Sequence, residues 1–187
     1  MIQKYYRVID DLSIPNRWYL QGPFTKSGKE VDPRGFTEGH RVKAKRFLTV
    51  PLRKPGKPLG LTLADFDMPV ASKEVADLLV SLAPKDIQRI PVEVSSQPLD
   101  YEIINVTTTI KCLDEKESEI LWWTEADKRP DKVGQYRMIT MLKIIPELVK
   151  KSQVFRIEGW KIALVMSETV KIALEKSGIT GIRFRKV

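Results

Sequence analysis

The sequence predicts an α+β fold in which a mainly antiparallel sheet is combined with two principal helices, each capped by a serine. The first helix should begin after Ser72, whose hydroxyl can accept from free backbone N–H groups, and should stop at Pro84. The second should begin after Ser167 and end at Gly178, a residue suited to the left-handed conformation that closes many helices. Apolar residues recur at helical spacing in both, so each helix should bury one face.

Two segments repeat this pattern along the chain. Each holds an extended stretch, a serine-capped helix and a strand in which a basic residue stands between two apolar ones. A weak internal duplication would explain the repeat, although short capped helices also arise independently. We therefore expect one domain over residues 1–187, with 1–95 and 96–187 as candidate sub-halves. The recurring helix positions are Ser72, Val75 and Leu79 in the first segment and Ser167, Val170 and Leu174 in the second.

Alternating apolar residues predict the longest strand over residues 101–113, with every second side chain from Ile104 to Cys112 on one face. The charged turn at 114–118 leads directly into residues 119–124, so these two runs are expected to pair as a hairpin. Shorter strands are expected at residues 4–9, 47–52, 135–144, 154–157 and 162–166.

The composition is that of a globular protein, with 42% hydrophobic and 30% charged residues in a chain of 187. The longest apolar run, residues 162–166, is far shorter than the roughly 18 residues that a membrane span needs. The first residues lack the hydrophobic region of a secretory signal. These features lead us to expect a cytoplasmic protein.

The net charge of +8 comes entirely from the first third of the chain. Residues 1–60 hold 13 Lys and Arg against 5 Asp and Glu, whereas residues 61–187 hold 19 of each kind. A nucleic-acid-binding module that uses the basic segment 41–57 is therefore an alternative function. The competing interpretation is a solvated strand and loop, since the segment lacks repeated stacking aromatics and a recognition helix.

The chain offers little that could carry catalysis or hold a metal. Its single cysteine, Cys112, and single histidine, His40, exclude an internal disulfide and a zinc site of the usual composition. We expect Cys112 to lie in a strand as a small apolar residue. The spaced aspartates at 65–67 and 127–131 are more typical of charged turns than of a cation site. The sequence therefore predicts a protein that is not an enzyme and that has no cofactor and no metal.

Residues 122–137 place two tryptophans and a tyrosine beside a dense run of alternating charges that Pro and Gly interrupt. Tryptophan, tyrosine and arginine supply much of the energy at protein interfaces, so this stretch is expected to bind a partner. An ordinary strand that ends in a solvated loop is the competing interpretation. The candidate partner-binding residues are Trp122, Trp123, Glu125, Asp127, Arg129, Asp131, Tyr136 and Arg137.

Strand alternation places adjacent side chains on opposite faces, so only one of Trp122 and Trp123 can reach a partner. The same holds for Tyr136 and Arg137 if both lie in the following strand, and the sequence does not choose within either pair. Clustered carboxylates nearby could speed the encounter with a basic partner. They are Asp114, Glu115, Glu117, Glu119, Glu125 and Asp127.

Ten short segments, in order over nearly the whole chain, together resemble one protein family. They include Arg17-Trp18-Tyr19-Leu20, Phe66-Asp67-Met68-Pro69-Val70 and the run from Pro130 to Met138, and the others lie at residues 5–7, 30–33, 36–39, 86–92, 123–125, 155–160 and 178–184. In this joint order the chain is similar to the immunity proteins of bacterial polymorphic toxin systems gathered as immunity family eleven.

The resemblance implies a non-enzymatic α+β protein, encoded beside a toxin that it binds and neutralises in the producing cell. It also implies that the toxin is often a nuclease. Inhibitors of nucleases are frequently acidic, whereas this chain is basic, so either the acidic face is local or the toxin is not a cation-lined nuclease. The expected partner is thus a cognate toxin protein, with no membrane and no specific nucleic acid.

Overall fold

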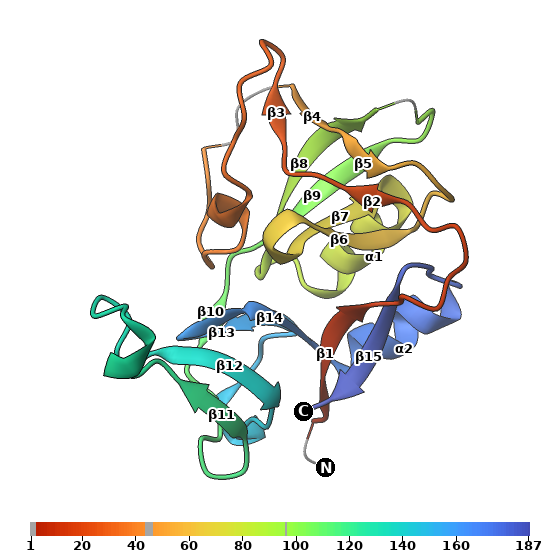
Figure 1. Ribbon diagram of the computed structural model, residues 1–187. Helices are drawn as coiled ribbons and strands as arrows, with labels where there is room; N and C mark the ends of the chain where they lie inside the picture. The colour runs from red at the N-terminus through yellow and green to blue at the C-terminus, as the bar shows by residue number, and fades with distance from the viewer. Residues whose placement is uncertain (1–2, 44–46, 96) are drawn as a thin grey trace.

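The computed structural model describes residues 3–43, 47–95 and 97–187 and contains two large sheets, each covered by one helix (Figure 1). The α+β fold expected from the sequence is confirmed. The two sheets lie one above the other in Figure 1, with the helices side by side between them and a two-stranded hairpin at the lower left.

The larger sheet forms the upper half of Figure 1. All of its pairings are antiparallel except the one between its second and third strands. Its six strands, in spatial order, are β3 (Phe24–Thr25), β4 (Leu48–Val50), β8 (Ile87–Val94), β9 (Tyr101–Val106), β7 (Met68–Ser72) and β6 (Leu61–Ala64).

The smaller sheet is antiparallel except for the pairing of its first two strands. Its five strands, in spatial order, are β10 (Thr109–Ile110), β13 (Val154–Ile157), β14 (Trp160–Ser167), β1 (Tyr5–Asp10) and β15 (Ile182–Lys186). The first strand of the chain therefore lies between two of the last, so the sheets do not divide the chain at residue 95.

The helices α1 (Lys73–Leu82) and α2 (Glu168–Lys176) begin at serines. Ser72 Oγ accepts from the Val75 N–H at 3.4 Å, and Ser167 Oγ accepts from the Val170 N–H at 3.3 Å. The two helices contact each other, and one apolar cluster holds residues of both helices and both sheets. Within the described ranges, no helix is long and apolar enough to cross a membrane.

Shorter elements complete the fold. A two-stranded sheet pairs β2 (Tyr19–Leu20) with β5 (Leu52–Lys54), and a second pairs β11 (Glu119–Trp122) with β12 (Tyr136–Met141). Four 3-10 turns are η1 (Pro33–Phe36), η2 (Asp65–Asp67), η3 (Glu125–Asp127) and η4 (Pro146–Leu148).

A buried arginine ties the two sheets together. Arg156 of β13 is fully buried and donates from Nη2 to the main-chain oxygen of Asp67 on η2, at 3.0 Å. Its Nη1 donates to the main-chain oxygen of Lys161 at 2.6 Å. Burial lowers the pKa of Arg156 to about 10, although the nearby Asp67 charge opposes this shift. The guanidinium thus joins a turn of the larger sheet to the strands of the smaller one.

The expected hairpin of residues 101–113 with 119–124 is wrong. Strand β9 ends at Val106 and is buried on both faces, because it lies between β7 and β8 with core on either side. The chain then crosses to the other sheet, and β11 pairs with β12 instead. Cys112 is buried as expected, but it lies outside any strand and its carbonyl accepts from the Ile145 N–H at 2.8 Å.

Candidate partner-binding surface

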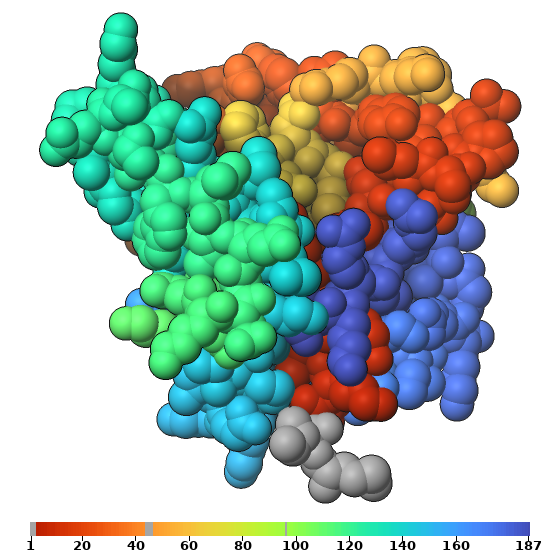
Figure 2. Space-filling model, turned by 60° about the horizontal axis from the view of Figure 1, so that its bottom comes forward, coloured from red at the N-terminus to blue at the C-terminus, as the bar shows by residue number. Residues whose placement is uncertain are grey.

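The β11–β12 hairpin and the loop at residues 123–135 that joins its strands form a lobe at one corner of the molecule. Figure 2 shows this lobe in green to teal, protruding at the upper left. The antiparallel register places Ile120 opposite Ile139 and Leu121 opposite Met138. Ile139 is buried in the cluster that covers the smaller sheet, so one face of the hairpin packs inward and the other is left to solvent.

Tyr136 anchors the inner face of the hairpin. Its ring packs on Gly159, where an added Cβ would lie 2.8 Å from the ring and where φ is +80°. Trp122 covers the same ring, with centroids 4.8 Å apart, and remains 41% exposed. The Tyr136 hydroxyl donates to the Glu115 carboxylate. Burial and this hydrogen bond raise the pKa of Tyr136 to about 12.

The outer face of the hairpin exposes large apolar side chains. Leu121 and Met138, which face each other across the strands, are 55% and 49% exposed, and Met141 is 43% exposed. Of the thirteen large apolar side chains exposed in the described residues, seven lie within residues 121–148, about a seventh of the chain. Such a concentration is unusual on a monomeric surface and is typical of protein-binding sites.

Trp123 is partly buried, with two cations against its ring. The Lys132 ammonium and the Arg137 guanidinium each lie 5.0 Å from the ring centroid. Arg137 also forms an ion pair with Asp127. A register shift between Leu121 and Trp122 makes Arg137 an extra residue of β12, with no residue of β11 opposite it. The hairpin therefore combines an apolar centre with a cation–aromatic group at the loop end.

The loop is held by its own polar side chains. The Thr124 N–H and hydroxyl both donate to Asp127 Oδ2, at 2.9 and 3.0 Å, and these bonds lower the Asp127 pKa. Arg129 forms a two-point pair with Asp131, at 3.0 and 2.8 Å, which lowers the Asp131 pKa. These charges are therefore engaged in shaping the loop, although each remains at its surface.

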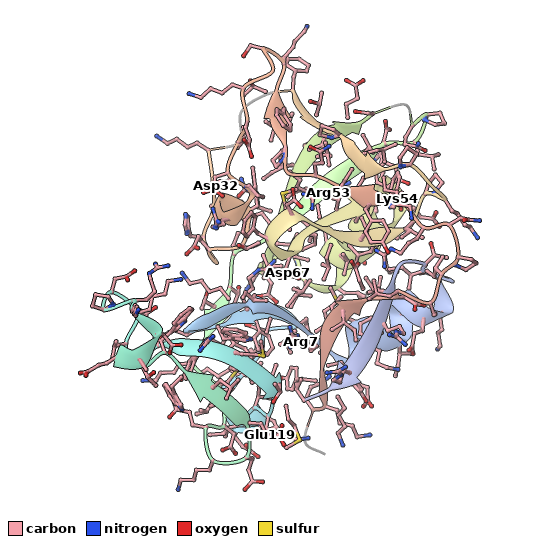
Figure 3. The ribbon with its side chains drawn as sticks, viewed as in Figure 1. Arg7, Asp32, Arg53, Lys54, Asp67 and Glu119 are labelled. Atoms are coloured by element: carbon pink, nitrogen blue, oxygen red, sulfur yellow. The ribbon has the colours of Figure 1, made fainter. Side chains whose placement is uncertain are left out.

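All eight candidate residues from the sequence lie on this one lobe, and the structure separates the pairs that the sequence left open. Trp122 stacks on Tyr136 and is the more exposed tryptophan, whereas Trp123 is partly buried and packs against Arg137. Of the carboxylates expected to steer a partner, Glu117 and Glu125 form no ion pair with the described residues. Glu119, at the start of β11 in Figure 3, accepts from the Thr140 hydroxyl at 2.9 Å.

Sequence reasoning missed Leu121, Met138 and Met141. The alternation of Tyr136-Arg137-Met138-Ile139-Thr140-Met141 identifies a strand but does not say which neighbour it pairs with. The error in pairing β11 hid the fact that these side chains meet on one open face. Because β11 and β12 pair as a two-stranded sheet, the sheet buries one face and exposes the other. Knowing that pairing would have been enough to identify the exposed side chains.

The basic segment 41–57 is less open than its sequence suggests. The Arg53 guanidinium pairs with both oxygens of Asp65, at 2.6 and 2.8 Å, and the Val42 main chain exchanges two 2.9 Å hydrogen bonds with Gln88. Residues 44–46, which include two of its basic residues, lie outside the described ranges. Its described residues form β4 of the larger sheet and β5, which pairs with β2.

The described part of the chain offers little support for metal binding or for catalysis by a cysteine. No three His, Cys, Asp or Glu side chains there come together as metal ligands. Burial raises the pKa of Cys112 to about 12, which keeps the thiol protonated at neutral pH and unsuited to nucleophilic attack. Asp65, one member of the spaced pair at 65–67, accepts from Arg53 and from the Gly22 N–H and so serves the fold.

Comparison with known proteins places the chain in a family. No curated protein matches it. The match to the immunity protein family (Imm11) extends over residues 3–187, which covers both sheets, both helices and the hairpin. This extent agrees with the resemblance carried by short segments of the sequence, and the chain belongs to the Imm11 immunity protein family.

Proposed function

We propose that this protein binds and neutralises a toxin encoded beside it, in the cytoplasm of the cell that produces both, and that the outer face of the β11–β12 hairpin is the contact surface. The observation that carries the choice of surface is the gathering of exposed Leu121, Met138 and Met141 on that face. Membership of an immunity protein family supports the neutralising role. The protein acts by binding and carries no catalytic step of its own.

The chemistry of the lobe suggests the chemistry of the partner. Buried apolar contacts at the centre of an interface supply most of its free energy, and the exposed Leu121 and Met138 can fill that role. Glu117 and Glu125, which have no ion pair in the described chain, can attract a basic surface and raise the association rate. A toxin with an apolar patch beside a basic cleft fits both features, so a nuclease is the toxin class that we propose.

Nucleic-acid binding by residues 41–57 is the weaker candidate. Arg53 is held by Asp65, and the described residues of that segment include no helix that could read bases. Any binding of DNA or RNA should therefore be non-specific and should disappear as salt is raised.

Co-expression tests the proposal directly. The neighbouring toxin gene is induced in a sensitive host with and without this protein, and growth is measured. Wild-type protein should restore growth. A variant with Leu121→Ser and Met138→Ser should protect poorly while its circular dichroism spectrum is unchanged. A variant with Lys54→Ala and Lys57→Ala, in the basic segment, is the matched control and should protect fully. Failure of the wild type would overturn the function, whereas full protection by the first variant would overturn only the surface.

A further inference from the structure

The pairing of β1 with β15 sets two arginines directly against each other. Arg7 lies opposite Arg185 in the antiparallel register. Side chains at such positions share one face of the sheet, with Cβ atoms about 5 Å apart, and like charges placed there destabilise the pairing. The two flanking pairs, Tyr6 with Lys186 and Val8 with Phe184, place no like charges opposite each other.

Neither arginine has an acidic partner. Seven other described arginines form ion pairs, including Arg183 with Asp11 at 3.4 Å, but Arg7 and Arg185 do not. The few residues outside the described ranges include no Asp or Glu, so no carboxylate side chain of this chain has been overlooked. Neither guanidinium is therefore held in an ion pair by a carboxylate of the described residues.

Arg7 is partly buried among other charged groups. Arg7 is half-buried, and burial lowers its pKa, with the Arg185 charge acting in the same direction and the Asp67 charge opposing both. Figure 3 shows Arg7 on β1, below the η2 turn that carries Asp67. Asp67 forms no ion pair with Arg7 in this structure, and burial raises the pKa of its own carboxyl group. Asp67 thus acts on Arg7 through its charge, without an ion pair between them.

We propose that Arg7 and Arg185 form a binding site for a phosphate group. Guanidinium groups present planar forks of N–H donors that match the oxygens of a phosphate in two-point contacts. A dianion between the two forks would turn a repulsive pair into two attractive ones. The site is open to solvent because Arg185 is exposed and β15 lies at the molecular surface, in dark blue in Figure 2. It is independent of the proposed toxin contact, since it uses different strands.

Free inorganic phosphate and a phosphate monoester present the same group. The site itself favours neither, because the two arginines contact only the phosphate oxygens. Inorganic phosphate and phenyl phosphate are therefore the two probes, and a stronger response to one of them identifies the source while supporting the site.

The experiment follows thermal unfolding of the full chain in increasing phosphate, at constant pH and at an ionic strength held constant with sodium chloride. The wild-type midpoint should rise and saturate, because a ligand that binds only the folded state stabilises it. Arg7→Gln and Arg185→Gln should each weaken phosphate binding about tenfold or more, the loss expected for a charge-assisted hydrogen-bonding group. Arg7→Lys, which keeps the charge but not the fork, should bind with intermediate affinity.

Two further results separate a binding site from a structural role. Without phosphate, Arg185→Gln should unfold at a higher temperature than the wild type, because the repulsion is gone. Lys186→Gln removes the same charge from the same strand on the opposite face, and its phosphate response should equal that of the wild type. The proposal is overturned if the wild type shows no saturable response, or if Arg185→Gln and Lys186→Gln respond alike.

Discussion

The β11–β12 hairpin and the basic segment 41–57 are both dense in charge, yet the fold uses them differently. In the basic segment, the buried apolar residues Leu48 and Val50 hold the chain to the larger sheet, and Arg53 is paired with Asp65. In the hairpin, only the inner face is anchored, and Leu121 and Met138 are left exposed on the outer face.

The difference teaches that net charge is a poor guide to a protein-binding surface. The sequence assigns the whole charge excess to the first 60 residues, but one of those charges, Arg53, is paired with Asp65 from the rest of the chain. The hairpin is nearly balanced in charge, and it is set apart by apolar surface that the described residues leave exposed. The predictions below test this contrast, from the largest expected effect to the smallest.

The largest effect should come from the apolar centre of the hairpin. Changing Leu121→Ser and Met138→Ser together should weaken toxin binding about a hundredfold, because contacts at an interface centre are worth about 1–2 kcal/mol each. Titration calorimetry with the purified toxin measures the change. The double variant Lys54→Ala and Lys57→Ala should alter the affinity less than about threefold, as expected for exposed charges outside the contact surface. Equal losses in both variants would remove the contrast between the two regions.

The next effect concerns how the hairpin is attached. Gly159→Ala should destabilise the protein by about 2–3 kcal/mol, because it combines a positive φ with a clash against Tyr136. Gly134 has the same φ of +80° but open space around it, so Gly134→Ala should cost only about 1 kcal/mol. Denaturant unfolding measures both. If the two variants lose equal stability, Tyr136 does not anchor the hairpin at Gly159.

A smaller effect should depend on pH. The pKa of Tyr136 is raised to about 12 in the folded protein, above its ordinary value of 10.0. The group therefore contributes stability that is fully present below pH 10 and is lost as the pH rises from 10 towards 12. Wild-type stability should fall more steeply over this window than that of Tyr136→Phe, as measured by denaturant unfolding at pH 9 and pH 11. Parallel losses would show that Tyr136 is not buried against Gly159 and Glu115.

The smallest effect should be kinetic. Changing Glu117→Gln and Glu125→Gln together should slow toxin association a few-fold at low salt and leave dissociation unchanged, because rim charges act mainly on encounter. Stopped-flow mixing at two salt concentrations measures both rates. Asp127 is unsuitable for this test, since its carboxylate holds the loop through Thr124 and Arg137. A change confined to dissociation would place these carboxylates inside the interface.

The helices could be predicted from the sequence because their signals are local. Ser72 and Ser167 stand three residues before the N–H groups that they accept from, and Pro84 and Gly178 follow the helix ends. The stretch 122–137 could be identified as a surface lobe because its polarity and its Pro and Gly residues exclude it from a core.

Strand pairing could not be predicted in the same way, because it depends on residues far apart in the chain. The six residues of β9 are buried on both faces, so alternation in this stretch indicates a strand but does not identify the strands that it pairs with. β11 pairs with a strand that follows a long loop rather than the one before its charged turn. The open face of Leu121 and Met138 exists only once that pairing is known, and the same is true of the Arg7–Arg185 pair.

Hydrogen exchange of the protein, alone and with its toxin bound, tests the central claim most directly. If the outer face of the hairpin is the contact surface, amides in residues 119–141 should exchange more slowly in the complex, while those in residues 47–57 should be unaffected. Slower exchange confined to residues 47–57 or to other parts of the larger sheet, with none in 119–141, would contradict the account.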